Sequence, residues 1–104
     1  MIIINNVPWR IAFVPSFDEM LMRPNGEYSL GVCDGYLQTI FINEHLSGDL
    51  LKDVLCHELV HAAIFSYGVS LSTEQEELLA GLIATYGEEI IQITDKIFHK
   101  LKEG

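Results

Sequence analysis

The feature that most constrains this chain is the stretch His57-Glu58-Leu59-Val60-His61, an H-E-x-x-H sequence. Two histidines four residues apart lie on one face of a helix, so both imidazoles can reach one Zn²⁺ at about 2.0–2.1 Å. Glu58 points about 100° round the helix from His57, where a general base can meet the metal's water without being a ligand. By average residue frequencies, such a pattern arises by chance in roughly one chain of this length in a few hundred. The pattern therefore predicts a zinc site.

The residues around this motif predict a central, buried helix. Apolar side chains occur on nearly every helical face from Leu50 to Phe65. Two histidines and a glutamate inside such a helix would cost free energy if they were left without partners. A metal ion and its water would satisfy all three groups. We therefore prefer a metal site to the alternative of two core histidines beside an exposed Glu58.

Composition limits the class of protein and its partners. A chain of 104 residues, 49% hydrophobic and 20% charged, predicts one globular domain over residues 1–104. The net charge of −9 argues against a nucleic-acid partner, which would need clustered Lys and Arg. No apolar run approaches the ~20 residues that span a membrane, and the first residues lack the basic region of a signal peptide. We expect a cytoplasmic protein with reduced Cys33 and Cys56.

The first 43 residues have the period-2 patterning of strands. Residues 1–14 predict a hairpin that turns at Asn5-Asn6, because asparagine tolerates positive φ. A second hairpin is expected from Tyr28–Asp34 and Tyr36–Asn43, with its turn at Asp34-Gly35. We expect an antiparallel sheet of about four strands.

The rest of the chain has helical patterning. A helix is expected over residues 48–67, with Ser47 as its N-cap, and a second from about 73 to Leu101, capped by Ser72 or Thr73. The predicted fold class is α+β, with the sheet packed on the buried H-E-x-x-H helix and followed by a long C-terminal helix. A heptad seam runs along that last helix, through the residues Leu79, Ile83, Tyr86, Ile90, Ile93 and Ile97. We expect the seam to be core rather than an oligomer interface, and the protein to be a monomer.

A catalytic zinc needs a third protein ligand. Cys33 would complete a site of the deformylase kind, but it lacks the glycine-rich neighbours of that family. His45 and His99 fit solvated surface positions better. The strongest candidates are the glutamates at the start of the next helix, which are Glu74, Glu76 and Glu77.

Periodicity alone favours Glu76 among these glutamates, and the small residues of the helix favour Glu77. Glu76 lies three residues before Leu79, on the side of the helix that we expect to pack inward, and Glu77 lies about 160° from Leu79. However, Ala80 and Ala84 continue the Glu77 face, and small side chains there would let the two helices approach closely. Both glutamates remain candidates on this evidence.

The motif and its partner on the next helix resemble the ImmA/IrrE-type metallo-endopeptidases of the gluzincin group. The second motif of that family is E-x-x-A-[D/N]-x-F-A, which Glu77, Ala80 and Ala84 match. Ile83 stands where Phe is usual, and Gly81 replaces the Asp or Asn that is expected to support the site. The resemblance implies a minimal gluzincin-like zincin core with Glu77 as the third zinc ligand. Such proteins are often carried by phages and mobile elements, where larger members cut repressors.

The function expected from this resemblance is zinc-dependent hydrolysis of a peptide bond in a protein or peptide substrate. His57, His61 and Glu77 would hold Zn²⁺, and Glu58 would take the water proton and pass it to the leaving amine. Either predicted strand, 28–34 or 36–43, could bind an extended peptide by strand addition. A negative chain favours basic substrate segments.

Two questions stay open at this level. The residue that stabilises the oxyanion is not identified, with Tyr67, Tyr86 and His99 as candidates. The alternative function is a catalytically weak or inactive zinc-containing module that acts through protein–protein interaction. The loss of Asp or Asn at Gly81 favours that alternative, and the intact Glu58 argues against it.

Overall fold

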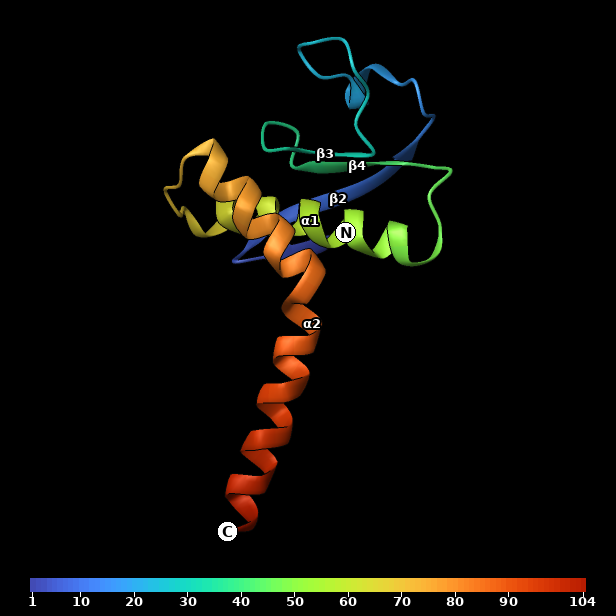
Figure 1. The fold of residues 1–104 in the computed structure, drawn as a ribbon. Coiled ribbons are helices and arrows are strands. Elements are labelled where there is room, and N and C mark those ends of the chain that lie inside the picture. The colour runs from blue at the N-terminus through green and yellow to red at the C-terminus, as the bar shows by residue number, and fades with distance from the viewer.

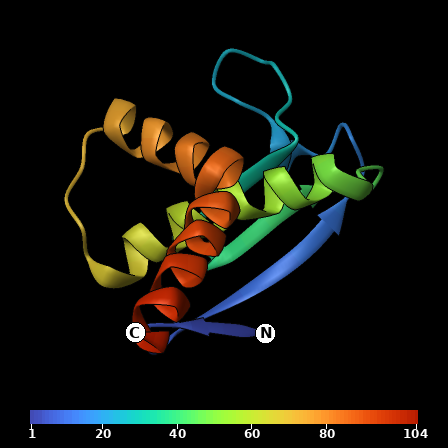
Figure 2. The ribbon, with the colours of Figure 1, turned by 60° about the horizontal axis from the view of Figure 1, so that its bottom comes forward.

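The computed structural model describes residues 1–104 and has four strands and two long helices (Figure 1). The predicted α+β class is confirmed. Helix α1 lies across the sheet, and α2 crosses α1 (Figure 2). The elements in chain order are β1 (Ile2–Ile4), β2 (Val7–Val14), a 3₁₀ turn η1 (Glu19–Leu21), β3 (Gly31–Asp34), β4 (Thr39–Asn43), α1 (Gly48–Tyr67) and α2 (Thr73–Glu103).

Both predicted hairpins form. Strands β1 and β2 pair antiparallel around Asn5 and Asn6, whose φ values are 48° and 66° as this turn requires. Strands β3 and β4 also pair antiparallel. Their connection is longer than the expected two-residue turn, and the Asp34 carboxylate closes it by accepting a hydrogen bond from the Leu37 N–H at 3.0 Å.

The sheet is mixed rather than wholly antiparallel. Its strand order is β1-β2-β4-β3, and β2 runs parallel to β4. Residues 15–30 connect β2 to the far edge strand β3, so the chain enters β4 in the direction of β2. Alternation of apolar residues reports which face a side chain lies on, but not the direction of the neighbouring strand. The antiparallel prediction is therefore wrong for this central pair.

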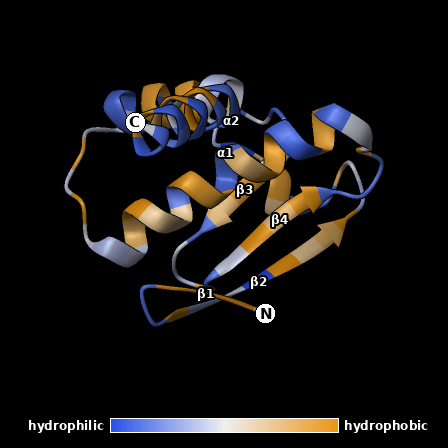
Figure 3. Cartoon of the chain, turned by 90° about the horizontal axis from the view of Figure 1, so that it is seen from below, coloured by the Kyte–Doolittle hydropathy of each residue, from blue (hydrophilic) through white to orange (hydrophobic).

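The core lies between the sheet and α1. Its centre is Trp9, Ile40, Ile42 and Ala62, all with no exposed surface. Strands β2 and β4 are mostly hydrophobic (Figure 3), and their side chains Trp9, Ile40 and Ile42 pack in one cluster with Ala62 of α1. The Trp9 indole N–H donates to Ser66 Oγ at 2.8 Å, which joins the first hairpin to the end of α1.

Helix α1 has the predicted bounds but is less buried than expected. It follows Ser47 and ends at Gly68, which adopts a left-handed conformation with φ of 65°. Only four of its 20 residues are buried. Leu50 and Phe65 are more than half exposed, because a four-stranded sheet and one crossing helix cover only part of the α1 surface. The prediction of burial on all faces is wrong.

Helix α2 is continuous from Thr73 to Glu103, as predicted. Ser72 is its N-cap, and the Ser72 and Gln75 side chains each accept a hydrogen bond from the other residue's backbone N–H. Its last part extends away from the rest of the molecule (Figure 1). The seam is not core, because Tyr86, Ile90, Ile93 and Ile97 are 48–55% exposed.

Candidate metal centre

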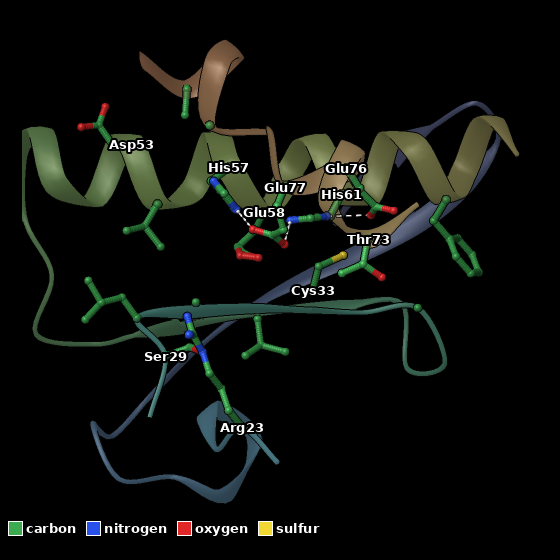
Figure 4. Close-up of a pocket in the computed structure, with 18 of the residues that line it drawn as sticks. Arg23, Ser29, Cys33, Asp53, His57, Glu58, His61, Thr73, Glu76 and Glu77 are labelled. Carbon is green, nitrogen blue, oxygen red and sulfur yellow. Dashed lines mark hydrogen bonds and ion pairs between the residues drawn. The ribbon is translucent and has the colours of Figure 1, made fainter. Parts of the chain in front are cut away.

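Helices α1 and α2 bring His57, His61 and Glu77 together (Figure 4). One ligand atom from each residue lies within 4.8 Å of the other two. The Glu77 carboxylate contacts His57 Nε2 at 3.1 Å and His61 Nε2 at 2.9 Å. Two imidazoles and one carboxylate are the donor set of His₂Glu zinc hydrolases. The residues present therefore fit a zinc ion.

Glu76 contacts the other side of the same site. Its carboxylate lies 2.7 Å from His61 Nδ1, so one glutamate contacts each nitrogen of the His61 ring. A proton on Nδ1, donated to Glu76, leaves Nε2 with a free lone pair for a metal. Glu76 therefore orients His61, while Glu77 takes the position expected of the third ligand.

Glu58 is buried in the wall of the cleft beside these groups. It is 7% exposed, and its burial raises the pKa of the carboxyl above its usual value, while His61 and His57 lower it. Gly31 on β3 allows the close approach of strand and helix. A Cβ at that position would lie 2.8 Å from Val54 Cγ1 and 3.0 Å from Glu58 Cγ. The Glu58 side chain is thus confined between α1 and the edge strand.

The cleft that contains this site has a volume of about 960 Å³ and lies between α1, α2 and β3. Its one Arg or Lys is Arg23, whose Nε donates to Ser29 Oγ on the side of the cleft opposite α1 (Figure 4). Sequence reasoning missed Arg23. The chain has only two arginines and a net charge of −9, and this scarcity of arginine is the one sequence signal that could have singled out Arg23. The predicted oxyanion candidates Tyr67, Tyr86 and His99 do not line the cleft.

The other predicted ligands lie outside the cluster. Cys33 lines the cleft from β3, but burial, with the negative charges of Glu58, Glu76 and Asp34, raises the pKa of its thiol to about 12. Cys33 is not among the residues whose ligand atoms converge, so the structure does not form a deformylase-like His₂Cys cluster. His45 faces Glu44 at 3.8 Å, and His99 lies on the last part of α2.

Only one of the two strands proposed for peptide binding has a free edge. Strand β4 is paired on both sides, by β2 and by β3. Strand β3 is at the edge of the sheet, and Gly31, Val32 and Cys33 line the cleft. An extended peptide in the cleft can therefore pair with β3.

Comparison of the chain with protein-family models, curated proteins and solved structures gives no match. The family resemblance therefore depends on the two motifs alone, and the fold and site stand on the geometry described above. Neither helix combines the length and the apolar character needed to cross a membrane.

Proposed function

We propose that this chain is a zinc-dependent metallopeptidase that hydrolyses a peptide bond of a protein substrate. The observation that carries the proposal is the convergence of His57, His61 and Glu77 within 4.8 Å, with Glu58 in the same cleft. A purely structural zinc site uses four protein ligands and has no need of a general base beside it. Three ligands with an adjacent buried carboxylate are the pattern of a hydrolytic site.

The chain's own residues each have a part in this chemistry. Zinc in such a site lowers the pKa of water toward ~7 and polarises a carbonyl group. The Glu58 carboxylate accepts a proton from the attacking water and returns it to the leaving amine nitrogen. Glu76 holds the His61 ring in one orientation. Arg23 supplies positive charge from the opposite wall and is the candidate for stabilising an oxyanion, in place of Tyr67, Tyr86 and His99.

Substrate preference follows from the edge strand and the charge. Backbone groups of β3 hold an extended segment by main-chain hydrogen bonds, which are independent of substrate sequence. The net charge of −9 attracts basic segments more than acidic ones. We therefore propose a substrate segment that is extended, accessible and basic.

The decisive experiment is Glu58→Gln, which keeps the size of the side chain and removes the base. Zinc content is measured together with cleavage of a peptide mixture by mass spectrometry. We expect zinc binding close to that of the parent chain and loss of cleavage. Glu74→Gln is the matched control, because Glu74 is exposed at the start of α2 and does not line the cleft. Equal cleavage by Glu58→Gln and parent would contradict the mechanism.

A second candidate is the zinc-containing binding module without strong catalysis. The observation that favours it is Gly81, which leaves open space where the family places a supporting side chain. The two functions separate in the native context, where Glu58→Gln abolishes the biological effect of a peptidase and leaves that of a binding module intact.

A further inference from the structure

The last part of α2, residues 89–103, is called the distal arm here, and it has no partner within the chain. The ion pair between Lys52 Nζ and Glu88 Oε2, at 2.8 Å, is the last polar contact that joins α2 to another element. Every residue from Glu88 to Gly104 is exposed. The arm gives the molecule its longest dimension of 56 Å (Figure 1).

The distal arm is nevertheless strongly amphipathic. Its apolar side chains are 48–74% exposed and gather on one side of the helix; they are Ile90, Ile91, Ile93, Ile97, Phe98 and Leu101. Glu89, Gln92, Asp95 and Lys96 occupy the other side. A helix with this patterning packs its apolar side against another element.

The heptad seam also lies on a side of α2 that α1 does not cover. Ala80 and Ala84 face α1, and Ile83, Tyr86 and Ile90 lie about 100–160° round the helix from Ala84. Ile83 is 38% exposed and Tyr86 is 53% exposed, although both precede the distal arm and belong to the part of α2 that contacts α1. The seam is therefore exposed from Ile83 through the distal arm, and only Leu79, at its start, is partly buried.

We propose that this seam pairs antiparallel with the same seam of a second copy, so that the protein is a two-fold symmetric dimer. This inference does not depend on the proposed peptidase function. The first argument is the distribution of charge. Residues 89–104 carry three acidic residues and three lysines, so the whole net charge of −9 belongs to residues 1–88. Parallel pairing would bring the negatively charged residues 1–88 of the two copies side by side. Antiparallel pairing places them at opposite ends of the dimer, where their repulsion is weaker.

The second argument is the match of side chains in the antiparallel register. When Ile90 meets Ile93 of the second copy, Ile97 meets Tyr86 of the second copy, and two-fold symmetry repeats each contact. The same register places Glu89 beside Lys96 of the second copy, again twice. In parallel pairing Glu89 would instead lie near Thr94 of the second copy, and this complementarity would be lost.

The first test is the mass of the full chain by analytical ultracentrifugation over a range of concentrations. We expect a dimer of twice the 11.7 kDa chain mass. Ile90→Asp combined with Ile97→Asp should give a monomer with native circular dichroism. The control is Gln92→Asp combined with His99→Asp on the polar side, which should stay dimeric. A parent chain that is monomeric at every concentration, or that forms a larger assembly, overturns the proposal.

The second test fixes the direction of pairing by exchanging charges. Glu89→Lys alone and Lys96→Glu alone each create like-charge contacts, and we expect the dimer dissociation constant to rise about threefold or more. The combined exchange restores opposite charges and should return the constant to within about twofold of the parent. A dissociation constant that the single exchanges leave unchanged, or that the combined exchange does not return toward the parent value, overturns the antiparallel arrangement.

Discussion

The two parts of α2 have the same heptad spacing and opposite surroundings. In residues 73–88 the helix buries Ala80 against α1 and brings Glu76 and Glu77 to the histidines of that helix. In the distal arm the same spacing continues, and every residue is exposed. The side of α2 that packs within this chain is therefore the side of Ala80, and most of the heptad seam is exposed in both parts of the helix.

The largest expected difference between the two parts concerns the metal. Glu76→Gln should lower zinc affinity by about 10–100-fold, because Glu76 only orients His61. Glu77→Gln should lower it further, because Glu77 supplies a ligand atom. Glu103→Gln, in the distal arm, should leave zinc affinity unchanged. Competition with a chelator measures all three. Equal affinities for Glu77→Gln and the parent would show that Glu77 is not a ligand.

The next effect concerns packing. Ala80 has no exposed surface, so Ala80→Leu should lower the free energy of unfolding by about 1–3 kcal/mol through overpacking against α1. Gln92 lies on the polar side of the distal arm, and Gln92→Leu should change that free energy by no more than about 0.5 kcal/mol. Urea denaturation compares the two. Equal losses would mean that the distal arm is packed in solution on this side as well.

A smaller effect, of opposite sign, is expected at Gly81. A Cβ at Gly81 meets no atom within 4 Å, so Gly81→Ala should raise the free energy of unfolding by about 0.4–1 kcal/mol. At Gly87, two residues before the distal arm, a Cβ would lie 3.2 Å from Ile83 Cγ2, and the gain from Gly87→Ala should be smaller. Thermal unfolding measures both variants. Destabilisation by Gly81→Ala would indicate that the open space is filled in solution.

The smallest effect belongs to the ion pair at the boundary of the two parts. The hydrogen bond between Lys52 and Glu88 raises the pKa of Lys52 and lowers that of Glu88. Their contribution to stability is therefore present at neutral pH. It is lost as pH falls through the lowered pKa of Glu88, or rises through the raised pKa of Lys52. Both groups are exposed, so Glu88→Gln should shift the midpoint of thermal unfolding only slightly at pH 7 and not at all in strong acid.

Local features of this fold could be predicted from the sequence because local geometry determines them. Asparagine tolerates positive φ, so the prediction of a turn at Asn5-Asn6 is confirmed. Glycine also tolerates positive φ, and Gly68 ends α1 in that conformation. The four-residue spacing of His57 and His61 places both rings on one side of α1 whatever the rest of the chain does.

Other features depend on contacts between distant residues, which spacing does not encode. The parallel pairing of β2 and β4 follows from the path of residues 15–30 across the molecule. Periodicity favours Glu76 because the pattern assigns Leu79, Ile83 and Tyr86 to the inward side of α2. Tyr86 is in fact 53% exposed, and the small residues Ala80 and Ala84 mark the packed side. Arg23 enters the cleft from a connection whose sequence has no periodic signal.

The hydrogen bond between Trp9 and Ser66 has a practical consequence for spectroscopy. Trp9 is the only tryptophan of the chain, it is fully buried, and its ring meets Phe65 edge-on with centroids 5.7 Å apart. Its fluorescence therefore reports whether the first hairpin is docked on the helix that carries both histidines. The distal arm makes no contact with this indole, so association of two arms leaves the emission spectrum unchanged. One intrinsic fluorophore thus reports unfolding of the body separately from the assembly of copies.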